Sequence, residues 1–450
     1  MLLSTDATLA ARARGLLADC GFSEAGLADP AGEDDPKGRL AALFLQATAQ
    51  DVDRARRLLG DNGFSALNEL GLLAVDGDKC RSTVLLYPLH GLLIASDFPA
   101  AGPSDDFVFP AISGQTHEYL SILPATPCDS LLEVGTGSGA AALLAADYAE
   151  NVVATDISQR CLQFAEFNRV LNDVENVEIV ESDAYDGLGD SRFDRIIAHP
   201  PYVPWTGDQE IYRHGGPDGE VVLRKLVEGL PERLLPGGRC YLSAMGADTA
   251  EAPLEARLRG MLGYRGGEFD ILVVEREILK PIEFILPWTE GEEMTFEEAW
   301  SLHEAFRERG IQRLVRCSIV LVHGGGTKTL RLKAGAATQS SDIEPAIEAR
   351  PKRWLEWSEI REMKLRIRPD VQLEETSFLD QGNWRAGVRV LDAPGPFAFR
   401  TDCPEWMAKA LPLLDGKRPV REVVTGDVDE DEAEALFGCL LDAGVVIERA

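Results

Sequence analysis

The sequence lacks paired cysteines, long hydrophobic runs and a leader pattern. Its eight cysteines are spread over 450 residues and none forms a CxxC pair, which predicts reduced thiols rather than a zinc or iron–sulfur site. No stretch reaches the roughly 20 apolar residues that span a bilayer. The first residues lack the basic segment and apolar core of a secretory signal. We therefore expect a cytoplasmic protein with no bound metal and no membrane partner.

Positive charge is also scarce. Lys and Arg number 45 against 75 Asp and Glu, which gives a formal net charge of −30. A chain this acidic repels a phosphate backbone unless it carries a local basic patch, and its basic stretches are short. Nucleic acid is therefore a disfavoured partner. The apolar fraction of 45% is ordinary for a globular protein and provides material for a sizeable core.

The pattern along the chain predicts three domains. Residues 1–98 show apolar residues at helical spacing and then a short strand pair, which predicts a small winged-helix-like α+β domain. Residues 101–330 alternate strand and helix, which predicts an α/β domain with a doubly wound, mostly parallel sheet. A small, polar stretch follows, and residues 347–450 again resemble a winged helix. Such modules often bind nucleic acid, but the charge favours packing or substrate positioning.

Three glycines follow the first strand of the α/β region. Gly135, Gly137 and Gly139 lie between a predicted strand, Leu131–Val134, and a predicted helix, Ala140–Ala149. Glycines at such a turn allow positive φ and let backbone N–H groups approach a ligand closely. The spacing is GxGxG, and an alanine stands where the GxGxxG loop of dinucleotide-binding folds has its last glycine.

Acidic residues follow the next two strands. Asp156 ends the second strand and Asp183 follows the third. In α/β sheets, ligands sit beyond the carboxyl ends of the strands, so the residues just after each strand matter most. We expect Asp156 to accept hydrogen bonds from ribose hydroxyls and Asp183 to accept from an adenine amine.

The fourth strand ends in the segment His199-Pro200-Pro201-Tyr202. Two consecutive prolines fix the loop and remove backbone donors, which leaves nearby carbonyls free to accept hydrogen bonds. The ring of Tyr202 can stack on a planar target. Trp205, just past this segment, either lines an acceptor pocket or packs.

Together these features resemble the Rossmann-like S-adenosylmethionine-dependent methyltransferases with an NPPY motif. The set of motifs is similar to that of the glutamine methyltransferases of release factors and ribosomal proteins, which carry a glycine-rich segment like residues 214–220. The resemblance implies a seven-stranded core and S-adenosylmethionine as the cofactor. The cofactor-binding residues that it implies are Glu133, Gly135, Thr136, Gly137, Gly139, Asp156, Ile157, Asp183, Ala184 and His199.

The resemblance also implies the chemistry of the second site. In that family, the asparagine side chain and the first proline carbonyl accept hydrogen bonds from the target amine group. Here His199 replaces the asparagine, and a neutral imidazole cannot offer the fixed donor–acceptor pair of an amide. Amine and hydroxyl acceptors therefore become possible targets beside the glutamine amide. We expect His199, Pro200 and Tyr202 to be catalytic, with His199 binding or deprotonating the acceptor, and Tyr202 and Trp205 to contact it.

The acceptor itself stays open at this level. The C-terminal segment resembles small winged-helix domains that recognise leader peptides, which points to a peptide substrate. The leading hypothesis is N- or O-methylation of a peptide, protein or small molecule. The alternatives are an RNA base N-methyltransferase, which the net charge disfavours, and a regulator that binds S-adenosylmethionine without catalysis, which the Pro-Pro-Tyr segment disfavours.

Overall fold

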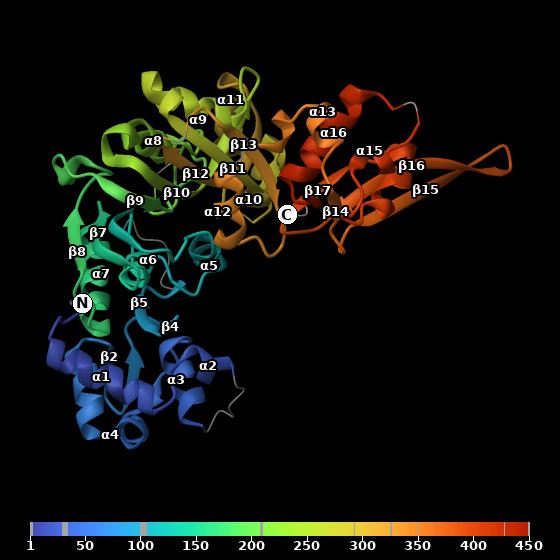
Figure 1. Cartoon of the computed structure of the whole chain (residues 1–450). Helices are drawn as coiled ribbons and strands as arrows, with labels where there is room; N and C mark the ends of the chain where they lie inside the picture. The colour runs from blue at the N-terminus through green and yellow to red at the C-terminus, as the bar shows by residue number, and fades with distance from the viewer. Residues whose placement is uncertain are drawn as a thin grey trace.

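The computed structural model describes residues 3–28, 35–99, 106–207, 210–291, 293–324, 326–349, 351–426 and 428–448 (Figure 1). Within these ranges, no helix is both long enough and apolar enough to cross a membrane. All eight cysteines lie outside disulfide bonds.

One sheet organises the α/β region. Its seven strands run in the spatial order β8-β7-β6-β9-β10-β12-β11, and neighbours from β8 to β10 are parallel, whereas β12 is antiparallel to both β10 and β11. This order confirms the predicted doubly wound α/β fold. The bounds are β6 Cys128–Val134, β7 Ala149–Asp156, β8 Val177–Glu181, β9 Phe193–Ala198, β10 Leu234–Thr249, β11 Phe269–Leu279 and β12 Ile311–His323.

Both faces of this sheet are buried, which explains why its strands read as apolar runs. Successive side chains point to opposite faces, so Ile196 and Ile197 belong to two different hydrophobic clusters. The helices α8 (Val221–Arg233) and α9 (Leu254–Met261) cover the first face, and α6 (Ala140–Ala145) packs in the second cluster.

The N-terminal region packs against the helix α7 (Gln159–Asn172), as Figure 1 shows. One cluster joins Leu17 and Leu67 of the N-terminal helices to Phe164, Phe167 and Leu171 of α7. The region holds α1 (Ala7–Asp19), α2 (Glu24–Ala28), α3 (Pro36–Phe44), α4 (Val52–Glu69), the small sheet β1 (Gln50–Asp51), β3 (Lys79–Ser82) and β2 (Leu73–Asp76), and the hairpin β4 (Leu85–Leu89) and β5 (Leu92–Ser96).

Two asparagines of α7 bind this hairpin as a neighbouring strand would. Asn168 accepts from the Ala95 N–H (2.8 Å) and donates to the Ala95 carbonyl (2.9 Å). Asn172, one turn on, makes the same two bonds to Leu93 (2.8 Å each). The fully buried Asn168 also donates to the carbonyl of Ser138 in the glycine loop (2.8 Å). These two amides therefore join the N-terminal hairpin, α7 and the glycine loop.

The C-terminal region continues the main sheet. The strands β13 (Thr329–Ala334), β17 (Phe397–Asp402), β16 (Asn383–Ala393) and β15 (Gln372–Asp380) follow β11 in spatial order, giving eleven strands in all. β13 lies within residues 328–345, the polar stretch that the sequence suggested as a domain boundary. Its alternation of Leu330 and Leu332 with charged residues is too short to be recognised as a strand pattern. Its side chains add Leu330 and Leu332 to the core. The predicted boundary thus does not interrupt the sheet.

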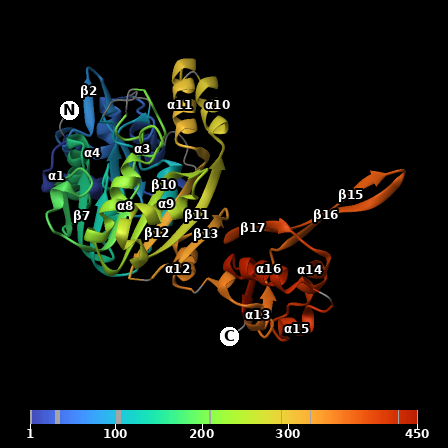
Figure 2. The ribbon, with the colours of Figure 1, turned by 90° about the horizontal axis from the view of Figure 1, so that it is seen from above.

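The rest of this region forms a separate cluster. It contains α13 (Trp357–Ile360), α14 (Glu405–Ala410), α15 (Val420–Val423) and α16 (Glu430–Asp442), with β14 (Leu365–Ile367) paired to β18 (Val446–Glu448), while α12 (Ser340–Glu348) packs on the main sheet. Beyond it, β15 and β16 project as a two-stranded ribbon (Figures 1 and 2).

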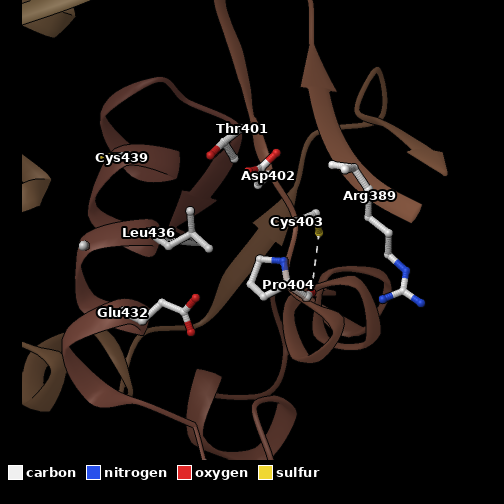
Figure 3. Close-up of a pocket in the computed structure, with 10 residues that line it drawn as sticks. Arg389, Thr401, Asp402, Cys403, Pro404, Glu432, Leu436 and Cys439 are labelled. Carbon is white, nitrogen blue, oxygen red and sulfur yellow. Dashed lines mark hydrogen bonds between the residues drawn. The ribbon is translucent and has the colours of Figure 1, made fainter. Parts of the chain in front are cut away.

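A hollow of about 570 Å³ lies between α16 and the strands β16 and β17 (Figure 3). Thr401 and Asp402 line it from β17, and Leu436 and Cys439 line it from α16. No residue of the predicted cofactor or acceptor site borders it.

The asparagine contacts generate a stability prediction. Asn168→Leu leaves three buried backbone groups without their partner, which we expect to lower the free energy of unfolding by about 3 kcal/mol or more. The matched control is Asn151→Leu, because Asn151 is exposed and makes a single 3.3 Å bond to Asp129. Urea midpoints measure both changes. Equal shifts in the two variants would contradict the role given to Asn168.

Candidate functional site

The carboxyl ends of four parallel strands bring the predicted residues to one edge of the sheet. The strands β6, β7, β8 and β9 end at Val134, Asp156, Glu181 and Ala198. The glycine loop, Asp183 and His199 follow directly. Strand topology alone therefore gathers residues that are more than sixty positions apart in the sequence.

The three glycines have two different roles. Gly135, Gly137 and Gly139 all have positive φ, at +73°, +55° and +82°. A Cβ atom on Gly135 or Gly137 would meet nothing within 4 Å, so these positions border open space. A Cβ atom on Gly139 would lie 3.2 Å from the Cα of Ala165. The first two glycines thus leave room for a ligand, and the third permits close packing of α7.

Glu133 is buried beneath the loop. Its side chain accepts from the Thr136 hydroxyl (2.6 Å) and from the Ala142 N–H (2.8 Å), both at the same oxygen, Oε2. Burial raises the pKa of Glu133 to about 8, and repulsion from Asp156 adds to this, although the two hydrogen bonds oppose it. The structure therefore places Glu133 and Thr136 as supports of the loop, and their predicted contact with the cofactor remains a prediction.

Asp156 faces the loop from the next strand. It accepts from the Gly137 N–H (2.8 Å) and from the Ser158 N–H (2.9 Å), one at each oxygen. A carboxylate has about four acceptor positions, so each oxygen can still accept a ribose hydroxyl. Burial raises the pKa of Asp156. The neighbouring Ile157 is 50% exposed, which leaves an apolar surface beside the predicted ribose position.

Asp183 lies at the outer end of the same edge. It forms an ion pair with Lys225 of α8 (2.8 Å), a partner that no sequence pattern indicated. The next residue, Ala184, is buried and has a φ of +51°, a conformation that is rare for a residue other than glycine. This strained turn follows β8 directly and fixes the direction in which Asp183 leaves the strand.

A buried hydroxyl lies near both Glu133 and His199. Tyr119, on the helix α5 (Gly114–Ser121), is 4% exposed, and its hydroxyl faces the carboxyl of Glu133 without making a hydrogen bond of ordinary geometry to a described residue. Buried donors without such a bond are rare in folded proteins. We expect this donor to bind the polar end of a ligand, such as S-adenosylmethionine, that occupies the open space above Gly135 and Gly137.

His199 stands between two tyrosine rings. Its ring centroid is 5.2 Å from that of Tyr119 and 5.6 Å from that of Tyr202, which is stacked at 28°. No hydrogen bond joins the imidazole to another residue in the described ranges. Burial lowers the pKa of His199 to about 4, and the charge of Arg316 adds to this against the opposing charge of Glu118. His199 is therefore neutral near pH 7.

A charged cluster with two arginines that the sequence did not indicate lies beside this histidine. Arg316 of β12 donates to both carboxylate oxygens of Glu118 (2.6 and 2.8 Å), and the Nε of Arg276 lies 3.2 Å from Glu118. Arg276 sits at a register shift between β11 and β12, and its buried Nη2 has no partner among the described residues. A bulge of this kind changes the direction of a side chain. No short sequence motif indicates where such a bulge occurs.

The loop after His199 is held by its own backbone and by aromatic packing. Val203 accepts from the Gly215 N–H, and Trp205 donates its N–H to the carbonyl of Gly216 (2.9 Å each). The ring of Trp205 stacks on His214 at 4.7 Å, and its side chain is 9% exposed. The structure thus places Trp205 in the packing of the loop, and its contact with an acceptor stays a prediction.

Comparisons with known proteins agree with this geometry. Residues 113–263 match the family model "Methyltransferase small domain". A release factor glutamine methyltransferase of Moorella thermoacetica is 35% identical over 141 residues, which cover 28% of this chain and 50% of that protein. A ribosomal protein uL3 glutamine methyltransferase of Bradyrhizobium diazoefficiens is 36% identical over 126 residues, covering 25% of this chain and 40% of that protein.

The chain therefore spans half or less of the length of these two curated relatives. Among solved structures, Trm5b from Pyrococcus abyssi matches with 15% identity and a TM-score of 0.34, covering 55% of this chain and 62% of that one.

The hydroxyl of Tyr119 leads to a prediction about cofactor binding. Tyr119→Phe removes an unpartnered donor, so we expect an unchanged or higher thermal midpoint and an affinity for S-adenosylhomocysteine that is about tenfold weaker. Calorimetric titration measures the affinity. Tyr185→Phe is the control, because the Tyr185 hydroxyl donates to the Leu226 carbonyl (3.1 Å). It should lose stability and keep its affinity. A Tyr119→Phe variant with wild-type affinity would rule out the hydroxyl as a cofactor ligand.

The motif, the loop geometry and the relatives all concern the same stretch of sequence. Strand order, glycine conformation and the open space over the loop agree with the cofactor that the sequence indicated, S-adenosylmethionine. Residues 113–263 match a methyltransferase domain and are similar in sequence to the glutamine methyltransferases of release factors and ribosomal proteins.

Proposed function

We propose that this chain is a methyltransferase that transfers a methyl group to a nitrogen of a polypeptide acceptor held at His199-Pro200-Pro201-Tyr202. The observation that carries the proposal is the neutral, unpartnered imidazole of His199, which lies between two tyrosine rings beyond the carboxyl end of β9. The relatives support a protein nitrogen as the target, since they are named for the glutamine of a release factor and of a ribosomal protein.

In this proposal, S-adenosylmethionine would supply the electrophilic methyl group. The nitrogen–carbon bond would form as the carbon–sulfur bond breaks and S-adenosylhomocysteine leaves, and the methylated nitrogen would lose one proton to solvent. The chain contributes position, because a nucleophile held in line with its target gains much of the rate acceleration. A neutral imidazole offers one acceptor nitrogen and one donor nitrogen. The acceptor nitrogen of His199 and the carbonyl of Pro200 can each take one N–H of the target, which aims the target's lone pair toward the methyl group.

The environment of His199 favours binding over proton abstraction. With a pKa of about 4, roughly one His199 in a thousand is protonated at pH 7. A base this weak removes a proton poorly, since general bases work best with a pKa near the working pH. The nearby Arg316, and any cationic cofactor, would oppose protonation further. Of the two roles that the sequence suggests for His199, binding the acceptor and deprotonating it, the proposal therefore takes binding through a hydrogen bond.

The surroundings also limit the access of water. Tyr202 is 8% exposed and Tyr119 is 4% exposed, while His199 between them is half-buried. A hydrogen bond to an acceptor that covers the rest of the imidazole would be stronger than in water. The two tyrosines also form flat walls that suit a planar amide.

Substitution of His199 separates acceptor binding from cofactor binding. For His199→Ala, we expect turnover to fall by about a hundredfold or more, as for other lost positioning groups, and the affinity for S-adenosylhomocysteine to stay within about twofold. Mass spectrometry of release factor and ribosomal protein fractions, incubated with isotopically labelled S-adenosylmethionine, measures turnover. Unchanged turnover would contradict the role proposed for His199.

His199→Asn is the companion variant. It restores the asparagine of the NPPY motif, so we expect it to keep or improve methylation of a glutamine amide, while an acceptor that needs an imidazole loses its methylation. If His199→Ala and His199→Asn fail equally on every acceptor, the side chain at position 199 does not select the target.

The lowered pKa also predicts how stability depends on pH. In the unfolded chain His199 titrates near 6.5, and in the folded chain near 4. Protonation therefore favours unfolding, and stability falls as the pH drops from about 6.5 to about 4. The difference between wild type and His199→Asn should reach up to about 3 kcal/mol. Urea titrations at pH 4.5, 5.5 and 7 measure it. A pH-independent difference would contradict the buried, neutral histidine.

A further inference from the structure

The helices α10 (Pro281–Glu290) and α11 (Phe296–Glu308) pack against the loop from His199 to Trp205, here called the acceptor loop. They connect β11 to β12 and lie side by side, projecting from the body as Figure 2 shows. Their inner faces belong to one hydrophobic cluster with the acceptor loop: Phe284, Leu302 and Phe306 pack there with Tyr202 and Trp205. The pair thus forms one wall behind the acceptor site.

The outer faces of the same helices are apolar as well. On α11, Phe296 is 82% exposed and Trp300 is 58% exposed; on α10, Ile282 is 50% exposed and Leu286 is 46% exposed. Residues four apart are neighbours on a helix surface, so each helix presents a continuous pair of large apolar side chains. Single exposed apolar residues are ordinary, but clustered ones mark an interaction site.

The charge around these side chains restricts the partner. Residues 281–308 contain eight acidic residues and one arginine, a net charge of −7. Glu283, Glu290, Glu297 and Glu308 are exposed. Such a surface repels nucleic acid, and it repels a second copy of this chain, whose own net charge is −30. The complementary partner is a basic polypeptide that carries apolar anchor residues.

We propose that the outer face of α10 and α11, centred on Phe296 and Trp300, docks the basic polypeptide that carries the methyl-accepting nitrogen. This inference rests on the proposed function, because it identifies the kind of acceptor. The docking face and the acceptor loop share one packed unit, so a polypeptide bound outside on α11 would be held by the same helical pair that packs against Tyr202 and Trp205. Aromatic anchors supply affinity, and the carboxylates supply charge selection and a faster association.

The test uses the full chain and a defined probe. The probe is a fluorescein-labelled synthetic helix of lysine and leucine with the leucines four residues apart, and anisotropy measures its binding. We expect Phe296→Ala/Trp300→Ala to weaken binding by at least about tenfold. The matched control is Phe378→Ala/Trp384→Ala on the β15–β16 ribbon, where the same two residue types are 54% and 74% exposed. It should stay within about twofold.

A charge variant tests the second half of the proposal. Glu290→Gln/Glu297→Gln should weaken binding and reduce its dependence on salt, because exposed charges are screened within about 10 Å at 0.1 M salt. Equal binding by wild type and Phe296→Ala/Trp300→Ala would overturn the proposal. So would a loss of binding confined to the ribbon variant. All substituted side chains are exposed, and the thermal midpoint verifies that each variant is folded.

Methylation of uL3 or release factor distinguishes this proposal from the proposed function. If docking is right, Phe296→Ala/Trp300→Ala raises KM for the protein about tenfold and leaves kcat and the affinity for S-adenosylhomocysteine unchanged. If His199→Ala stops methylation while Phe296→Ala/Trp300→Ala leaves KM unchanged, the docking proposal fails and the function stands. If the peptide requires Phe296 and Trp300 but no protein is methylated, the docking face stands and the function fails.

Discussion

Two asparagine side chains on α7, of which Asn168 is fully buried, connect the separate parts of this molecule. Asn168 and Asn172 satisfy both backbone groups of alternate residues in β5, and Asn168 reaches the glycine loop as well. Buried backbone groups need such partners, since each one left unpaired is costly. The same helix touches the loop at Gly139, where only a glycine fits. The position of the cofactor loop therefore depends on α7 and on the N-terminal hairpin that α7 holds.

Desolvation determines the chemistry at the edge of the sheet. Burial raises the pKa of Glu133 and of Asp156, and it lowers the pKa of His199. All three shifts favour the neutral form, as expected where water is excluded. In the proposed site, a cationic cofactor would restore part of the lost solvation of the two carboxyl groups and would oppose a charge on the histidine. The edge thus combines two carboxyl groups of raised pKa with a histidine of lowered pKa.

The sequence predicted the α/β core and the order of its site residues, because these depend on local patterns. The glycine loop needs glycines at three positions, and the strands are apolar runs that end at polar residues. Two partners escaped prediction. Arg276 and Arg316 come from β11 and β12, and only the register of the sheet brings them to Glu118 beside His199. The polar stretch that includes β13 suggested a domain boundary, whereas the structure has a strand of the main sheet there. A strand of six residues shows too short a period to be distinguished from a loop.

By itself, the sequence indicated the cofactor and the positions of the glycine loop and the His199-Pro200-Pro201-Tyr202 segment, because each depends on consecutive residues whose spacing fixes the backbone conformation. The tertiary structure decided the environment of His199. Its lowered pKa follows from desolvation between Tyr119 and Tyr202 and from the charge of Arg316. It decided as well that the segment between β11 and β12 folds back on the acceptor loop as a helical pair. Burial and long-range electrostatics depend on residues that are distant in the chain, so only the folded molecule specifies them.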